Sequence, residues 1–102
     1  MARTPIAGEV VRVEFQFTQG PDGPGQDVGG VTFSYMAPGA TVPATIVPTQ
    51  ILADPQTGDA EPGWWVVDVP TTVEGTYRCL ATATTPQTSH IVGSFVVAPR
   101  PF

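Results

Sequence analysis

Cys79 and His90 are the two residues whose side chains could act together as a nucleophile and its base. Such a pair requires contact between thiol and imidazole, and a third group that orients the imidazole. Cys79 is in phase with Tyr77 in an alternating segment, which favours a buried face where cysteine packs as a small apolar residue. His90 borders a loop, where an imidazole is usually solvated. We therefore predict that neither residue is catalytic and that the chain is not an enzyme.

Carboxylates gather in two turn-rich segments, where their oxygens could bind calcium. One segment holds Asp54, Asp59 and Glu61, and the other holds Asp22 and Asp27. Neither segment has the ligand spacing of a calcium hand, and solvated turn residues account for both. A carboxylate pair for glycoside hydrolysis is no more specific, because any acidic surface offers such pairs. We predict no metal site.

Phosphate chemistry is disfavoured by the types of residue present. The Gly-rich segment 20–30 lacks both the lysine of a phosphate-binding loop and a following helix, so we expect no nucleotide cofactor. The chain has no lysine, and its formal net charge is -5. Its four cations are Arg3, Arg12, Arg78 and Arg100. Four dispersed arginines cannot form the basic face that nucleic acid or an anionic membrane surface requires, so we predict neither partner.

The fold must be held together by packing. Cys79 is the only cysteine, so an intrachain disulfide and a zinc site of several thiolates are both impossible. The first residues lack the apolar run of a signal peptide, and no stretch approaches the length of a membrane span. We expect the chain to be made in a cytoplasm without an export signal.

Glycine and proline exclude a helical protein. The 102 residues include 11 Gly and 12 Pro, which resist helix interiors and fall mostly between segments of alternating apolar and polar residues. Pro43 and Pro48 restrict segment 41–52 to the edge of a sheet, and segment 53–63 reads as a loop. The sequence therefore predicts an all-β sandwich of two antiparallel sheets with six strands and room for a seventh. The other predicted strands are 8–18, 28–36, 64–69, 76–84 and 91–97.

The predicted organisation is one sandwich domain, residues 8–97, between an N-terminal arm, residues 1–7, and an extended C-terminal tail, residues 98–102. The two arms carry too little apolar surface to pack heavily alone. We expect them to be disordered or to be ordered by a neighbouring molecule, and Phe102 at the chain end favours the neighbour. We therefore count Arg3, Arg100 and Phe102 as candidates for partner binding.

Trp64 and Trp65 must point to opposite faces of a regular strand. Because Trp65 is in phase with Val67 and Val69, we assign it to the core. Trp64 and Val66 then form an outward apolar pair. Exposed tryptophan is common in protein interfaces, although a neighbouring loop could equally cover this one. Trp64 and Val66 complete the candidates for partner binding.

Residues 75–79, GTYRC, resemble the G-x-Y-x-C motif that opens the sixth strand of immunoglobulin-like domains. The partner cysteine of a true immunoglobulin domain is absent. Longer pieces are similar to small immunoglobulin-like proteins of tailed-bacteriophage virions. These pieces are VVRVEFQFT at 10–18, GWWVVDVPTTVEGTYRCLATAT at 63–84 and GSFVV at 93–97. The resemblance implies an immunoglobulin-like sandwich in which the tyrosine hydroxyl holds the preceding corner.

The resemblance also implies a location and a class of function. Immunoglobulin-like domains in such phages decorate the capsid or form appendages of the head, neck and tail. The expected function is a non-enzymatic capsid decoration or cement protein in the virion, bound as a homo-oligomer to the outside of the major capsid protein shell. The alternatives are a neck, head-to-tail or tail appendage protein, and a free module that binds carbohydrate or a host surface.

Overall fold

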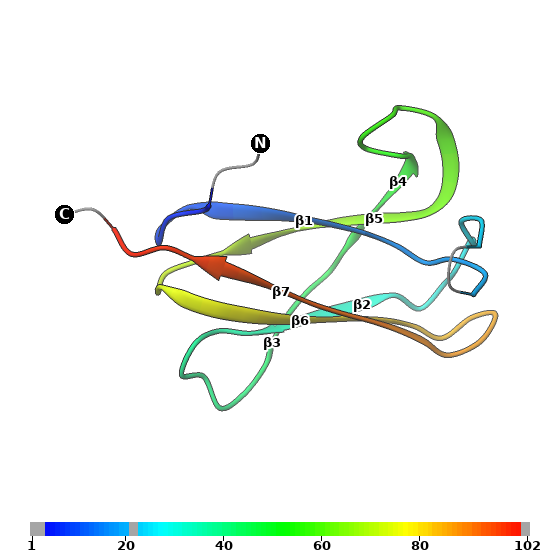
Figure 1. Ribbon diagram of the computed structural model, residues 1–102. Helices are drawn as coiled ribbons and strands as arrows, with labels where there is room; N and C mark the ends of the chain where they lie inside the picture. Colours follow the sequence, from blue (N-terminus) through cyan, green and yellow to red (C-terminus); the bar gives the residue numbers. More distant parts are fainter. Residues whose placement is uncertain (1–3, 21–22, 101–102) are drawn as a thin grey trace.

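Alternating apolar residues build two antiparallel sheets that pack face to face (Figure 1). The computed structural model describes residues 4–20 and 23–100. The described residues form strands, turns and loops without a helix, and the sole cysteine is a free thiol. The strands are β1 Val10–Gln16, β2 Thr32–Met36, β3 Ala44–Ile46, β4 Thr49–Ala53, β5 Ala60–Pro70, β6 Gly75–Ala83 and β7 Ser89–Val97.

The strand order is that of an immunoglobulin-like sandwich. One sheet has the order β1-β5-β4 and the other has the order β3-β2-β6-β7. These orders correspond to strands B-E-D and C′-C-F-G of the immunoglobulin fold. Segment 41–52 provides β3 and β4, each at the edge of a sheet, as its prolines required. The predicted all-β fold of about seven strands without a disulfide is confirmed.

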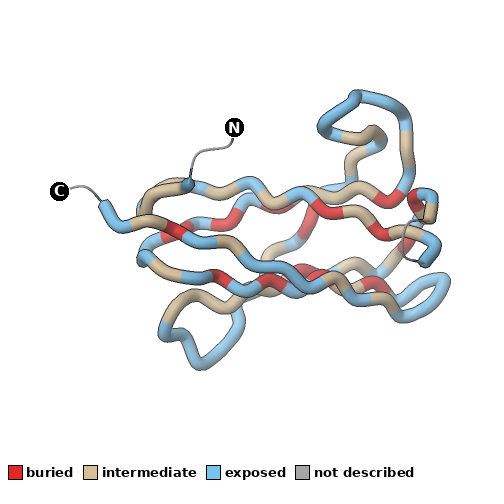
Figure 2. Tube along the Cα trace, viewed as in Figure 1, coloured by how far each residue is buried: buried red, intermediate tan, exposed pale blue. Residues whose placement is uncertain are grey.

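The core lies between the two sheets, where Figure 2 shows buried residues in red along both layers. Phe15 of β1 stacks on Phe33 of β2 with ring centroids 5.8 Å apart, so this contact joins the sheets. Trp65 of β5 packs against the core, as its phase predicted. Its indole N–H is buried and has no hydrogen-bond acceptor among the described residues.

Tyr77 forms the corner that the resemblance implied. Its side chain is only 1 % exposed, and its ring stacks on Phe95 with centroids 5.1 Å apart. The Tyr77 hydroxyl donates to the Val73 carbonyl at 2.9 Å and accepts from the Val73 N–H at 3.3 Å. These bonds fix the turn that takes the chain from β5 in one sheet to β6 in the other.

The β4–β5 connection is shorter than predicted. Strand β5 begins at Ala60, inside the segment 53–63 that we expected to be a loop. Ala53 pairs with Ala60, and the register then shifts before Ile51 pairs with Trp64. Pro62 lies within that shift, where its missing N–H removes no hydrogen bond from the ladder. A proline at this position is therefore compatible with a strand. The sequence alone did not show that the strand begins before Pro62.

The two arms pair with each other in their described parts, and we call this pairing the terminal clasp (residues 5–8 and 98–100). Ile6 and Ala98 form a parallel bridge, in which the Ala98 N–H donates to Pro5 and the Ala7 N–H donates to Ala98. The Arg100 Nε donates to the Ala7 carbonyl at 3.3 Å. Backbone pairing within the chain thus supplies these residues with partners that apolar packing does not, and contact of the arms with a neighbouring molecule stays a prediction.

Candidate interaction surfaces

Cys79 and His90 do not form a catalytic pair. Cys79 pairs with Gly93 and points into the core, where it is 8 % exposed. His90 pairs with Thr82 and is exposed on the opposite face of the same sheet. Burial removes water from the Cys79 thiol and raises its pKa. A nucleophilic cysteine needs the reverse shift, toward thiolate at neutral pH.

We expect Cys79 to resist thiol reagents in the folded protein. A buried thiol with a raised pKa carries little thiolate, so labelling with a chromogenic disulfide near pH 8 should be at least ~100-fold slower than in denaturant. Timed absorbance measurements with and without urea provide the check. Equal rates in the two conditions would contradict the assignment of Cys79 to the core.

The carboxylates of the 54–61 segment are used by the local fold. The Asp54 carboxylate accepts the N–H of Gln56 at 2.8 Å and of Thr57 at 3.4 Å, which closes the turn between β4 and β5. The Glu61 carboxylate accepts the Trp64 indole N–H at 3.4 Å. Within residues 4–20 and 23–100, no three histidine, cysteine or acidic side chains are grouped closely enough to hold a metal ion. Asp22 lies outside the described residues.

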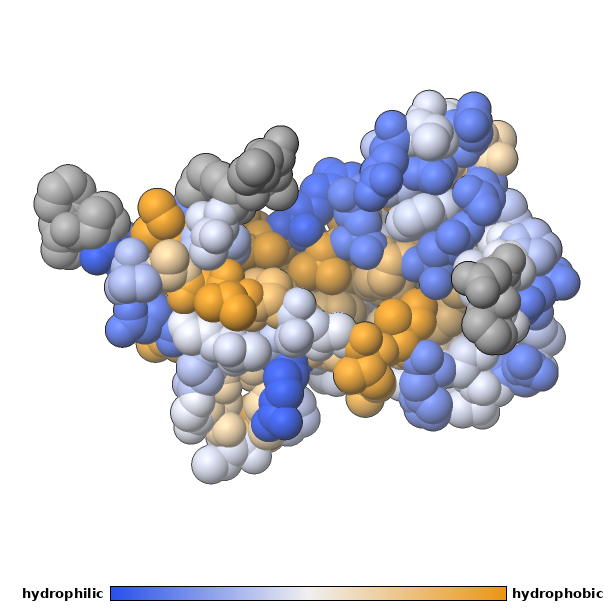
Figure 3. Space-filling view, viewed as in Figure 1, coloured by the Kyte–Doolittle hydropathy of each residue, from blue (hydrophilic) through white to orange (hydrophobic). Residues whose placement is uncertain are grey.

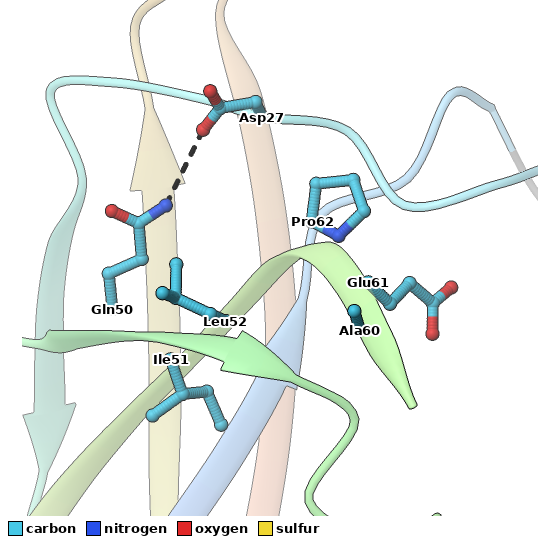
Figure 4. Close-up of a pocket in the computed structure, with 7 residues that line it drawn as sticks. All are labelled: Asp27, Gln50, Ile51, Leu52, Ala60, Glu61 and Pro62. Atoms are coloured by element: carbon cyan, nitrogen blue, oxygen red, sulfur yellow. Dashed lines mark hydrogen bonds between the residues drawn. The ribbon is translucent and has the colours of Figure 1, made fainter. Parts of the chain in front are cut away.

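A hollow of ≈ 330 Å³ lies beside β4 and the start of β5 (Figure 4). Asp27 and Gln50 point toward one another across it, and the Gln50 amide donates to the Asp27 carboxylate at 3.4 Å. The Glu61 carboxylate points away from that pair in Figure 4. The hollow therefore has one hydrogen-bonded carboxylate at its rim and does not bring two acids together for hydrolytic chemistry.

The predicted outward pair of β5 is only partly exposed. Trp64 and Val66 lie on the outer face of the β1-β5-β4 sheet, and both are half-buried. Trp64 has Gln16 and Ile51 as its cross-strand neighbours, and Val66 lies between Glu14 and Thr49. Three of these four neighbours are polar or charged, and the indole N–H of Trp64 already has a partner within the chain.

Three large apolar side chains are exposed together on the outer face of the other sheet. Val92 is 78 %, Val96 is 56 % and Leu80 is 38 % exposed. Leu80 pairs with both Ser34 and Val92, so these side chains form one row across β2, β6 and β7. A shallow hollow of ≈ 360 Å³ lies over this row, and Met36 and Arg78 are among its lining residues. We call the outer surface of β2, β6 and β7 around Met36, Leu80, Val92 and Val96 the apolar face.

The apolar face carries no carboxylate, although the chain has nine. Its charged or titratable side chains are Arg78 and His90, and the other outward residues of these strands are serine, threonine or apolar. The opposite sheet, in contrast, presents Glu14 and Asp68. An acidic protein therefore has one face that a partner can approach without meeting a negative side chain.

The apolar face was not among the sequence predictions, because the outward residues of segments 76–84 and 91–97 were not considered as a surface. In segment 91–97 both alternating sets contain apolar residues, with Val92 and Val96 opposite Ile91 and Phe95. That double pattern was the available signal. Of the predicted partner-binding residues in the arms, Arg100 is exposed and belongs to the terminal clasp, while Arg3 and Phe102 lie outside the described residues.

The chain matches no protein-family model, no curated protein and no solved structure. The part of the chain that the structure describes has no helix long and apolar enough to cross a membrane.

Proposed function

We propose that the chain is a non-enzymatic structural protein of a tailed-phage virion, and specifically a decoration or cement protein on the outside of the capsid. The observation that carries this proposal is the apolar face, with Val92 at 78 % exposure on a surface without carboxylates. Large exposed apolar groups on a sheet face are typical of surfaces that bind another protein. The similarity of segments 10–18, 63–84 and 93–97 to virion proteins favours a capsid partner.

In this proposal the apolar face binds the major capsid protein. Leu80 and Val92 supply contact area at the centre, and Arg78 beside them offers a donor for a carboxylate of the capsid surface. Trp64 and Val66 are a second, more polar contact region on the opposite sheet. Two such surfaces on one rigid sandwich allow a decoration subunit to contact both the shell and a neighbouring subunit.

We expect Val92→Lys to weaken attachment to capsids at least tenfold, an effect of about 1.4 kcal/mol. A lysine there would be placed against an apolar partner surface and would lose water without gaining a counter-charge. Leu52→Lys is the matched control, because Leu52 is 80 % exposed but lies on β4, away from the apolar face. Co-sedimentation with capsids that lack this protein, prepared from the phage that encodes it, measures both affinities. Equal losses for the two variants would exclude the apolar face as the attachment surface.

The number of copies per particle separates the proposed function from a neck or tail role. Quantitative mass spectrometry of purified virions should find hundreds of copies, in proportion to the major capsid protein. A count of about 6 or 12 would instead indicate a ring at the neck or tail, which has cyclic symmetry. Absence from purified virions would overturn the whole proposal.

A further inference from the structure

The sandwich has four edge strands, and β7 differs from the other three. Strand β3 has only three residues and lies between Pro43 and Pro48. Strand β4 contains a register shift between Ile51 and Ala53. Short length, flanking proline and an irregular register are the features by which proteins prevent their edge strands from pairing with other chains.

Strand β1 is also protected, whereas β7 is not. Arg12 and Glu14 place two charged side chains on β1. Strand β7, by contrast, runs for nine residues without proline, with an unbroken register to β6 and with His90 as its only titratable side chain. Its centre, Gly93, is exposed, and a Cβ built there would meet nothing within 4 Å. A long, regular, uncharged edge is a template for strand addition.

The backbone of the terminal clasp shows which groups of β7 face outward. The N–H and C=O of Ala98 both bond to the N-terminal arm, at the edge away from β6. Successive residues of a strand direct these groups to opposite edges, so positions 90, 92, 94 and 96 present theirs to the same side as Ala98. Among the described residues, Ala98 is the one whose backbone N–H and C=O are hydrogen-bonded at this edge. The N-terminal arm thus pairs with this edge at its C-terminal end, at Ala98, whereas the edge is unpaired at positions 90 to 96.

Apolar side chains of the core lie next to this edge. Ile91 and Phe95 pack against the core but are only half-buried. Figure 3 shows hydrophobic residues in a band between the two layers, on the side where β1 and β7 face the viewer. Because the chain has a net charge of -5, two copies repel each other over most of their surface. Strand β7 has no carboxylate, so two copies can meet along it without that repulsion, and unlike the carboxylate-free edges β3 and β4 it is long and regular.

We propose that β7 pairs antiparallel with β7 of a second copy, with Gly93 opposite Gly93. In this register the backbone N–H and C=O groups of residue 92 form hydrogen bonds with those of residue 94 in the second copy, across a two-fold axis. The two glycines form a pair without mutual hydrogen bonds, where the Cα atoms of antiparallel strands are closest. Ile91 then lies opposite Phe95 of the second copy, a favourable aromatic and β-branched pair. The two four-stranded sheets become one sheet of eight strands, and the two apolar faces become contiguous.

Hydrogen exchange of the unmodified protein is the first test. In dilute solution the amides at 92, 94 and 96 should exchange rapidly, whereas those at 91, 93 and 95, bonded to β6, should be protected. At millimolar concentration the protein should sediment as a dimer, and exchange at 92, 94 and 96 should slow at least tenfold. A monomer at every concentration, or a dimer in which these amides still exchange rapidly, would overturn the proposal.

A crosslink tests the register. Gly93→Cys combined with Cys79→Ala should form a disulfide-linked dimer on mild oxidation, because the two Cα atoms would lie within the 4.4 to 6.8 Å that a disulfide spans. Removing Cys79 is necessary because it pairs with Gly93 in the same chain. Leu52→Cys in the same background is the control and should remain monomeric. Equal crosslinking of the two variants would exclude the β7 pairing. Neither test involves capsids, so its outcome is separate from that of the proposed function.

Discussion

Tyr77→Ala should lower the free energy of unfolding by about 3–5 kcal/mol, which is a large part of the ~5–15 kcal/mol typical of a folded domain. The side chain is 1 % exposed and stacks on Phe95, so truncation leaves a cavity that a two-sheet core cannot close. The two hydrogen bonds between its hydroxyl and Val73 are lost as well. Urea unfolding followed by tryptophan fluorescence measures the change, and the slope with urea should stay constant if only stability is altered.

Tyr77→Phe separates the contribution of the ring to the free energy of unfolding from that of the hydroxyl. Because the ring remains, we expect a loss of about 0.5–1.5 kcal/mol from the two hydrogen bonds alone. Tyr35→Phe is a matched control that removes a hydroxyl from a half-buried tyrosine outside the corner. If Tyr77→Phe were as harmful as Tyr77→Ala, the hydroxyl and not the ring would hold the corner. If it were harmless, the corner would not depend on these bonds.

The second large effect is expected at Gly63. Its φ of 93° lies in the region that other residues rarely adopt, and an added Cβ would approach the Phe17 carbonyl oxygen and lie 2.8 Å from the Gln26 carbonyl oxygen. Gly63→Ala therefore combines backbone strain with displacement of two neighbouring segments, for a loss of about 2–6 kcal/mol in total.

Gly58→Ala provides the control for Gly63→Ala. Gly58 has a similar φ of 79°, but its Cβ would meet nothing within 4 Å. Only strain should be added there, at a cost of about 1–2 kcal/mol. Thermal unfolding of both variants compares the two costs. Similar unfolding temperatures would mean that Phe17 and Gln26 move aside without penalty and that close packing at Gly63 contributes little.

The alternation of apolar and polar residues predicted the interior well, because a strand with one buried face has an apolar residue at every second position. Phe15 and Trp65 pack in the core as their phase required, and Tyr77 makes the corner implied by residues 75–79. Alternation predicted strand ends less well. β2 begins at Thr32 rather than at 28, and β5 begins at Ala60, because pairing with Ala53 determines that end.

The surface was predicted less well than the core, for a physical reason. Exposure of an outward residue depends on its neighbours across the sheet, which a single chain segment does not reveal. Trp64 was expected to be exposed and is half-buried beside Ile51, whereas Val92 lies beside Leu80 and remains 78 % exposed. Likewise, the pairing of Ile6 with Ala98 joins residues that are remote in sequence, so no local pattern could indicate it.

The terminal clasp determines how the sandwich would respond to mechanical force. Its two segments run parallel, so tension applied through the chain before Pro5 and after Ala98 pulls them in opposite directions along their length. The hydrogen bonds of Ala98 to Pro5 and Ala7 are then loaded together in shear and not broken one after another by peeling. The core strands bear load only after the clasp ruptures. A subunit held at both ends of its chain would thus extend little before it yields, and its resistance would be set by a few backbone bonds far from the aromatic core.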